Sequence, residues 1–61
     1  GDQLNVELQG FQQLQLYTMT GKEVFTSTES TVRIGTLTKG LYLLILTGKD
    51  GEKVNLKVMK Q

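Results

Sequence analysis

The sequence predicts an all-β domain, a sandwich or barrel of about six short antiparallel strands. Short apolar or alternating runs recur along the chain, and turn signals such as Gly21 and Gly35 separate them. No window carries the 3.6-residue periodicity of an amphipathic helix over a useful length. With 61 residues the chain can hold only one small domain, so we expect residues 1–61 to form a single unit, in which Gly1 is a remnant of tag cleavage.

Composition excludes several classes of site. The chain has neither cysteine nor histidine, so it lacks disulfides, the usual zinc ligands, the commonest general base and the best nucleophile. We therefore expect no catalytic residue, no metal and no cofactor. The net charge is +1, with the lysines concentrated in residues 39–61, which is too weakly basic for a nucleic-acid partner. The longest apolar run, 41–46, is too short to insert into a membrane.

The first half of the chain predicts three strands. Alternation over residues 4–8 places Leu4, Val6 and Leu8 on one inward face, and Gly10 ends the run in a turn. Residues 14–19 form the next predicted strand, with Leu14 and Leu16 on the same face. A tight turn over 20–23 leads into a third strand over 23–28, which is rich in β-branched and aromatic residues. The last two strands therefore make a hairpin.

The second half predicts three more strands. Residues 31–34 form a short strand, and the loop over 35–40 is anchored in the core by Leu37. Residues 41–46 are apolar at every position, which is typical of a central strand. Asp50-Gly51 is a strong hairpin signal, and the alternating run 53–61 returns antiparallel beside the central strand.

The strand over 41–46 has two apolar faces, of which only one can pack on the opposing sheet of so small a domain. Leu41, Leu43 and Ile45 lie on one face, and Tyr42, Leu44 and Leu46 lie on the other. The chain also has no proline to protect an edge strand. The second face then meets a neighbouring domain, a missing strand or a second copy of the chain, and we expect a tendency to form edge-paired or strand-swapped homodimers.

Other candidate sites have ordinary explanations. The carboxylate pairs Glu23 with Glu29 and Asp50 with Glu52 could in principle cleave a glycosidic bond, but charged residues in turns and at strand ends are mostly solvated. Lys53, Asn55 and Lys57 share one strand face and could contact phosphates, although lysines on an edge strand more often discourage aggregation. Three aromatic residues could stack on a sugar or base, but such residues more often lie in a core or an interface: Tyr17, Phe25 and Tyr42.

Three segments carry a family resemblance. Residues 14–24 form a strand–"nxxGqxv"–strand hairpin, residues 37–45 resemble an "LpaGvYilrv" segment, and residues 50–61 resemble a closing "dGkxxxxKivkq". Together they resemble the C-terminal sorting domain of the type IX (Por) secretion system of Bacteroidetes. The family's Pro-Asn-Pro start is missing, so we expect the chain to start just downstream of it and to lack a first strand. The family's Pro-Ala is Thr38-Lys39 here, and its Val is Leu41.

This resemblance implies a non-catalytic, immunoglobulin-like antiparallel sandwich of six to seven strands that follows a cargo domain. It implies recognition by an outer-membrane translocon and cleavage by a sortase-like peptidase, with passage through the periplasm to the cell surface or the medium. Six residues match the family's motif positions and are the candidate recognition residues: Gly21, Gly40, Tyr42, Gly51, Lys57 and Lys60. The alternative is a carbohydrate-binding or adhesion module, which an exposed aromatic platform would favour and a buried Tyr17 and Tyr42 would disfavour.

Overall fold

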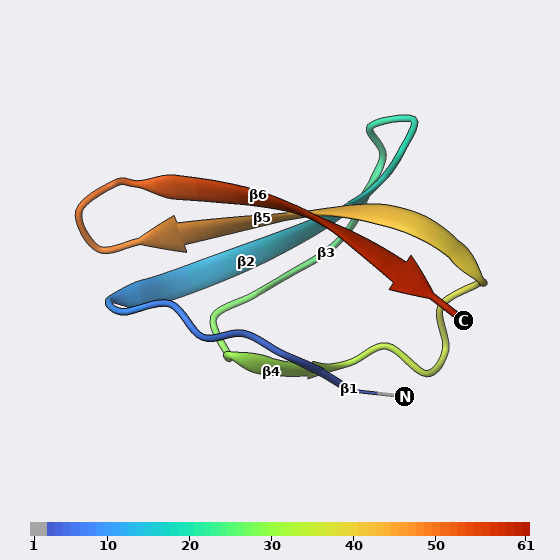
Figure 1. The fold of residues 1–61 in the computed structure, drawn as a ribbon, viewed down its shortest axis with the longest axis horizontal. Coiled ribbons are helices and arrows are strands. Elements are labelled where there is room, and N and C mark those ends of the chain that lie inside the picture. The colour runs from blue at the N-terminus through green and yellow to red at the C-terminus, as the bar shows by residue number, and fades with distance from the viewer. Residues whose placement is uncertain (1–2) are drawn as a thin grey trace.

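The computed structural model describes residues 3–61, so the expectation for Gly1 lies outside the described residues. These residues form strands connected by turns and loops, and no helix occurs among them (Figure 1). The all-β prediction is therefore confirmed. The strands are β1 (Gln3–Asn5), β2 (Phe11–Thr18), β3 (Glu23–Ser27), β4 (Thr31–Arg33), β5 (Gly40–Gly48) and β6 (Lys53–Lys60).

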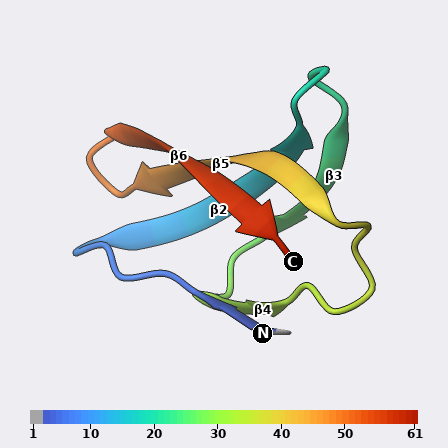
Figure 2. The same ribbon diagram turned by 45° about the vertical axis from the view of Figure 1, so that its right-hand side comes forward.

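The strands form two antiparallel sheets. The large sheet has the order β3-β2-β5-β6, and the small sheet pairs β1 with β4. In Figure 2 the small sheet lies against one face of the large one, as in a sandwich. Leu4 of β1 and Val32 of β4 pack against the core from the small sheet. The part of the chain in residues 3–61 contains no helix that is long and apolar enough to cross a membrane.

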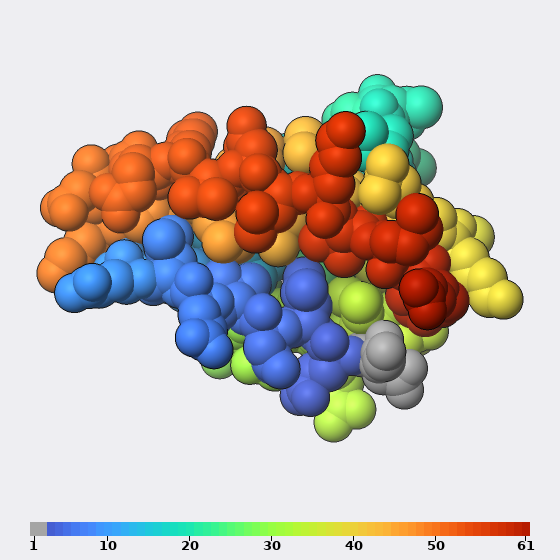
Figure 3. All heavy atoms as spheres, in the orientation of Figure 1, coloured from blue at the N-terminus to red at the C-terminus, as the bar shows by residue number. Residues whose placement is uncertain are grey.

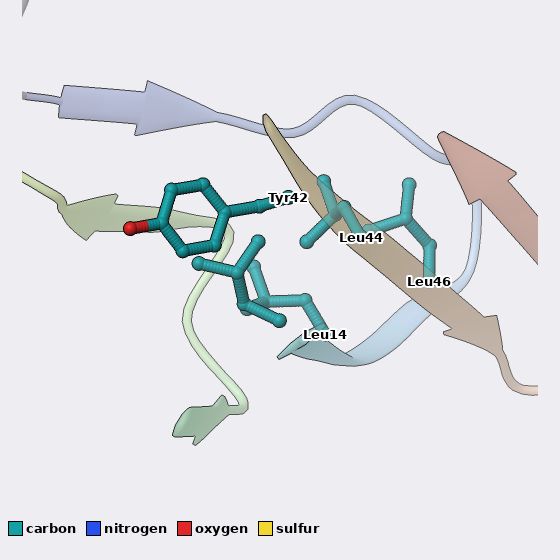
Figure 4. Close-up of a cluster of buried hydrophobic side chains, with 5 residues drawn as sticks. Leu14, Tyr42, Leu44 and Leu46 are labelled. Atoms are coloured by element: carbon teal, nitrogen blue, oxygen red, sulfur yellow. The ribbon is translucent and has the colours of Figure 1, made fainter. Parts of the chain in front are cut away.

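The core is built mainly by the two central strands of the large sheet. Leu14, Leu16, Tyr42, Leu44 and Leu46 form its buried cluster, part of which is shown in Figure 4. These side chains alternate along β2 and β5, because every second residue of a strand points to the same face. Burying one such side chain stabilises a domain by about 1.5–3 kcal/mol, so this short stripe carries much of the folding free energy.

The predicted turns are present. The β5–β6 hairpin closes with hydrogen bonds from the Gly48 amide to the Glu52 carbonyl and from the Gly51 amide to the Gly48 carbonyl, each 3.0 Å. Gly51 has a φ of 84°, a conformation that costs a residue with a Cβ atom. The β2–β3 hairpin also forms, with a register shift after Leu16. Leu37 is half-buried against the core, which confirms it as the anchor of its loop.

Two strand boundaries differ from the prediction by three residues, and the others agree within two residues. The strand expected over 4–8 ends at Asn5, because its partner β4 offers only three residues for pairing. Val6 still donates a hydrogen bond to the Ser30 carbonyl, and Val6 and Leu8 still pack on the core, so the inward face was predicted correctly. β2 begins at Phe11 instead of Leu14. An irregularity between Phe11 and Gln13 lets this strand continue pairing with β5 beyond the run that alternates.

The edge strand β6 is covered much less than β5. Leu56 lies opposite Leu44 and therefore faces the core side of the sheet, yet 45% of its surface is exposed. The small sheet does not extend far enough to cover it. Figure 3 shows the β6 side chains on the surface along the whole strand.

Candidate recognition site

The loop before β5 is fixed by a tyrosine of that strand. The Tyr42 hydroxyl donates a 2.6 Å hydrogen bond to the Thr38 carbonyl, while its ring is buried in the core. Figure 4 shows the ring beside the leucines of the core, with its oxygen directed away from them. A single side chain thus joins the hydrophobic core to the backbone of the surface loop that precedes it.

Gly40 sets the direction in which the chain enters β5. Its φ is +147°, and a Cβ atom built on it would meet nothing within 4 Å. The glycine is therefore required by backbone conformation and not by lack of space. Gly40 itself is half-buried.

The turn between β2 and β3 lies at the same end of the large sheet. Thr18 accepts a 3.0 Å hydrogen bond from the Gly21 amide at its carbonyl and a 3.1 Å bond from the Lys22 amide at its hydroxyl. The Thr18 and Thr20 hydroxyls are also 2.9 Å apart. Gly21, with a φ of +94°, allows the chain to close this compact turn.

The strand register brings four of the six candidate residues to this end. Thr18 pairs with Tyr42, and Gly40 pairs with Lys60, so the β2–β3 turn, the start of β5 and the end of β6 lie together. We call this the C-terminal end of the sandwich. It holds Gly21, Gly40, Tyr42 and Lys60.

An open groove of about 340 Å³ lies at the C-terminal end, between the β2–β3 turn and the loop before β5. Thr38 and Tyr42 line it from the loop side, and Lys22 and Glu23 line it from the turn. Lys22, Lys39 and Lys60 are all located at this end of the sandwich, which makes it rich in cations. The groove can therefore receive a small side chain or loop. Lys22 and Glu23 both line it, whereas Lys39 and Lys60 add positive charge outside its lining.

The other two candidate residues lie elsewhere. Gly51 belongs to the β5–β6 turn at the opposite end of the large sheet. Lys57 pairs with Leu43 in the middle of β6, on the face that points away from the core. Gly51 therefore shapes the hairpin that supplies β6, whereas Lys57 is exposed midway along that strand.

The aromatic side chains do not share one face. Tyr42 is buried in the core and Phe25 is half-buried against it, whereas Tyr17 pairs with Leu43 on the outer face of the sheet. They therefore provide no common platform for stacking on a sugar or base. Within residues 3–61 no three acidic residues come together in a way that could hold a metal ion.

Some features of this end could not be read from the sequence. The groove exists only because the register places two turns from different parts of the chain side by side. The Tyr42 hydroxyl bonds to a backbone carbonyl, and every residue has one, so the sequence does not mark Thr38 as the partner. The only available signal is that the two residues are four positions apart. The exposure of Leu56 depends on how far the small sheet extends, for which the sequence carries no signal.

Comparison with known proteins identifies the family. The model of the secretion system C-terminal sorting domain matches residues 1–61, the whole chain. Neither a curated protein nor a solved structure gives a significant match. Domains of this family are the C-terminal signals of cargo proteins that the type IX secretion system exports, so that the cargo is secreted or attached to the cell surface. The chain belongs to the type IX secretion C-terminal sorting domain family.

Proposed function

We propose that this single domain, residues 1–61, is a non-catalytic signal that the outer-membrane translocon of the type IX system reads at the C-terminal end of the sandwich. The cargo domain precedes it in the chain, crosses the inner membrane first and waits in the periplasm. After translocation a sortase-like peptidase removes the signal and attaches the cargo to the cell surface. The family match supports a role in type IX export, and the steps named here refine that role.

One observation carries the choice of surface. Three features that depend on a glycine or a tyrosine lie at the same end of the large sheet as the end of the last strand: the Gly21 turn, the Gly40 backbone and the Tyr42–Thr38 hydrogen bond. A receptor that contacts all three features would bind only when each of them is formed. It would therefore bind a folded sorting domain and not an unfolded tail.

Charge supplies the second part of recognition. Lys60 is at this end and Lys57 is exposed along the strand that leads to it. An acidic receptor surface would therefore be attracted to the last strand before the close contacts form.

A reporter fusion tests this proposal. Residues 1–61 are joined to the C-terminus of a fluorescent protein that is exported to the periplasm of a bacterium with a working type IX system. We expect surface display or release that depends on the translocon and that is lost when residues 57–61 are deleted. The retained fraction is measured by cell fractionation and by fluorescence after protease treatment of intact cells.

A matched pair of charge reversals locates the site. Lys60→Glu changes the C-terminal end, and Lys49→Glu makes the same charge change in the β5–β6 turn at the opposite end. We expect Lys60→Glu to retain the reporter in the periplasm and Lys49→Glu to leave export unchanged, with both variants folded by circular dichroism. Equal retention by both, or by neither, would contradict a recognition site at the C-terminal end.

A further inference from the structure

β6 is the long regular open edge of the described part of the molecule. It lies at the end of the large sheet and pairs with β5 over eight consecutive residue pairs without a register shift. The opposite edge, β3, has five residues and an irregularity in its pairing, and β1 and β4 have three residues each. Bulges and short strands protect the other edges against further pairing, whereas β6 has neither.

The hairpin shows which backbone groups of β6 are free. The hydrogen bond from the Gly48 amide to the Glu52 carbonyl makes Gly48 and Glu52 a hydrogen-bonded pair. Such pairs alternate along an antiparallel ladder, so the even-numbered residues of β6 direct their backbone groups to β5. The odd-numbered residues direct theirs to the open edge: Lys53, Asn55, Lys57 and Met59.

We propose that two copies of this domain associate through β6, antiparallel and edge to edge, about a two-fold axis at Leu56. The two large sheets then form one continuous sheet, with both small sheets on the same side. Leu56 lies opposite Leu56 of the second copy, and Val54 lies opposite Val58. The free groups of Lys53 and Asn55 meet those of Met59 and Lys57, so the backbone groups on both edges are paired. This association goes beyond the sorting function and does not depend on it.

The charges of β6 favour this register over the two registers whose axes lie one residue away. We call the line along which the two β6 strands pair the seam. With the axis at Leu56, Glu52 of one copy lies opposite Lys60 of the other at both ends of the seam, and no like charges face each other. An axis at Lys57 would place Lys57 against itself. An axis at Asn55 would place Lys53 against Lys57 twice. Like charges directly opposite each other destabilise a strand pair, so the lysines of β6 oppose these two registers while permitting the axis at Leu56.

The proposed pairing would cover apolar side chains of β6 that the small sheet leaves exposed. Leu56 is on the core side of the sheet but 45% exposed, and Val54 and Val58 are half-buried beside it. In the proposed pair these side chains contact their counterparts instead of water. A single strand edge is a small interface, so we expect a weak, concentration-dependent dimer.

Single cysteines test the register, because the chain has no cysteine of its own. Leu56→Cys would place the two sulfur atoms on the axis in a pair without backbone hydrogen bonds, where side chains approach closely enough for a disulfide. Lys57→Cys would do so only with the axis at Lys57. Met19→Cys reports random collision, since Met19 is 51% exposed and lies in the β2–β3 turn. We expect Leu56→Cys to form covalent dimers at least tenfold faster than either of the others.

Charge exchange tests the ends of the seam in the chain without cysteines. Sedimentation velocity over a range of concentrations measures dimer formation. We expect Glu52→Lys alone and Lys60→Glu alone to weaken the dimer, and the double exchange Glu52→Lys/Lys60→Glu to restore it. Circular dichroism confirms that each variant folds.

Two results would overturn the proposal. Oxidation of Leu56→Cys at the rate of Met19→Cys would show that the β6 edges do not meet at Leu56. A chain that sediments as a monomer at every concentration, and is unaffected by the exchanges, would show that β6 remains open or serves a different protein. Both measurements use the isolated domain, so neither depends on whether the translocon recognises it.

Discussion

β5 and β6 have nearly the same length and pair along eight residues, yet they differ in what surrounds them. β5 lies between two strands of the large sheet, and its core-facing side chains are buried. β6 has one neighbour, and its core-facing Leu56 remains 45% exposed. The comparison shows that position in the sheet, and not the hydrophobic pattern alone, decides how much of a leucine side chain is buried. The position also leaves β6 free to contact other molecules.

The largest expected effect separates two leucines that lie opposite each other in the ladder. Leu44 of β5 is 1% exposed, so Leu44→Ala should cost about 2–5 kcal/mol through lost burial and a cavity. Leu56→Ala removes the same atoms from a half-exposed site and should cost less than half as much. Chemical denaturation followed by circular dichroism measures both free energies of unfolding.

The variants Leu44→Ala and Leu56→Ala could also contradict the difference in packing between β5 and β6. A domain of this size has a small free energy of unfolding, so Leu44→Ala is expected to unfold at a much lower denaturant concentration than the unchanged chain. Equal losses for Leu44→Ala and Leu56→Ala would mean that the edge strand is as well packed in solution as the central one. Under the conditions of the measurement, a dimer that covers Leu56 would produce such a result, so both variants are compared at low protein concentration.

A smaller effect is expected where β5 begins and β6 ends. Gly40→Ala forces a residue with a Cβ atom to adopt a φ of +147° and should destabilise the domain by about 1–3 kcal/mol, although the space around it is free. Lys60→Ala, opposite Gly40 in the ladder, should change stability by less than about 0.5 kcal/mol. Thermal unfolding measures both. Gly35→Ala is the control, because Gly35 lacks a positive φ; an equal loss there would trace the effect to the loop as a whole.

The smallest effect concerns the hydroxyl that fixes the loop before β5. Tyr42→Phe removes the 2.6 Å bond to the Thr38 carbonyl and should cost about 1 kcal/mol, with the ring left in the core. Tyr17→Phe makes the same change on the outer face of the sheet, where the Tyr17 hydroxyl has no hydrogen bond to residues 3–61, and should be nearly neutral. Amide hydrogen exchange of residues 35–40 should increase only in Tyr42→Phe. Increased exchange in both variants would argue against a specific role for this bond.

Sequence patterns predicted the strands and turns well because these depend on local chemistry. The alternation of Leu14 with Leu16 and the Asp50-Gly51 turn each reflect a few neighbouring residues, and both were found as expected. The all-apolar run 41–46 indicated a central strand, and β5 does lie between β2 and β6. The resemblance to the sorting domain family was confirmed over the whole chain.

What the sequence could not provide depends on contacts between distant segments. The strand over 4–8 was predicted too long because its pairing stops where β4 ends. The groove beside Tyr42 and the meeting of Gly40 with Lys60 follow from the register of three strands, which no single segment specifies. The roles of the six candidate residues remain predictions, of which four lie together at the C-terminal end.

The β1–β4 ladder is much shorter than the β5–β6 ladder, so the two ends of the domain should differ in their resistance to a pulling force. β1 is held by three residue pairs and the Val6–Ser30 hydrogen bond, whereas β6 is held along eight residue pairs. Detaching β6 requires breaking a ladder of eight residue pairs, whereas β1 is a short contact that opens within a few residues. A domain pulled between its two ends would therefore yield first at β1, and the large sheet that holds the C-terminal end would stay folded while force is transmitted through the cargo side of the chain.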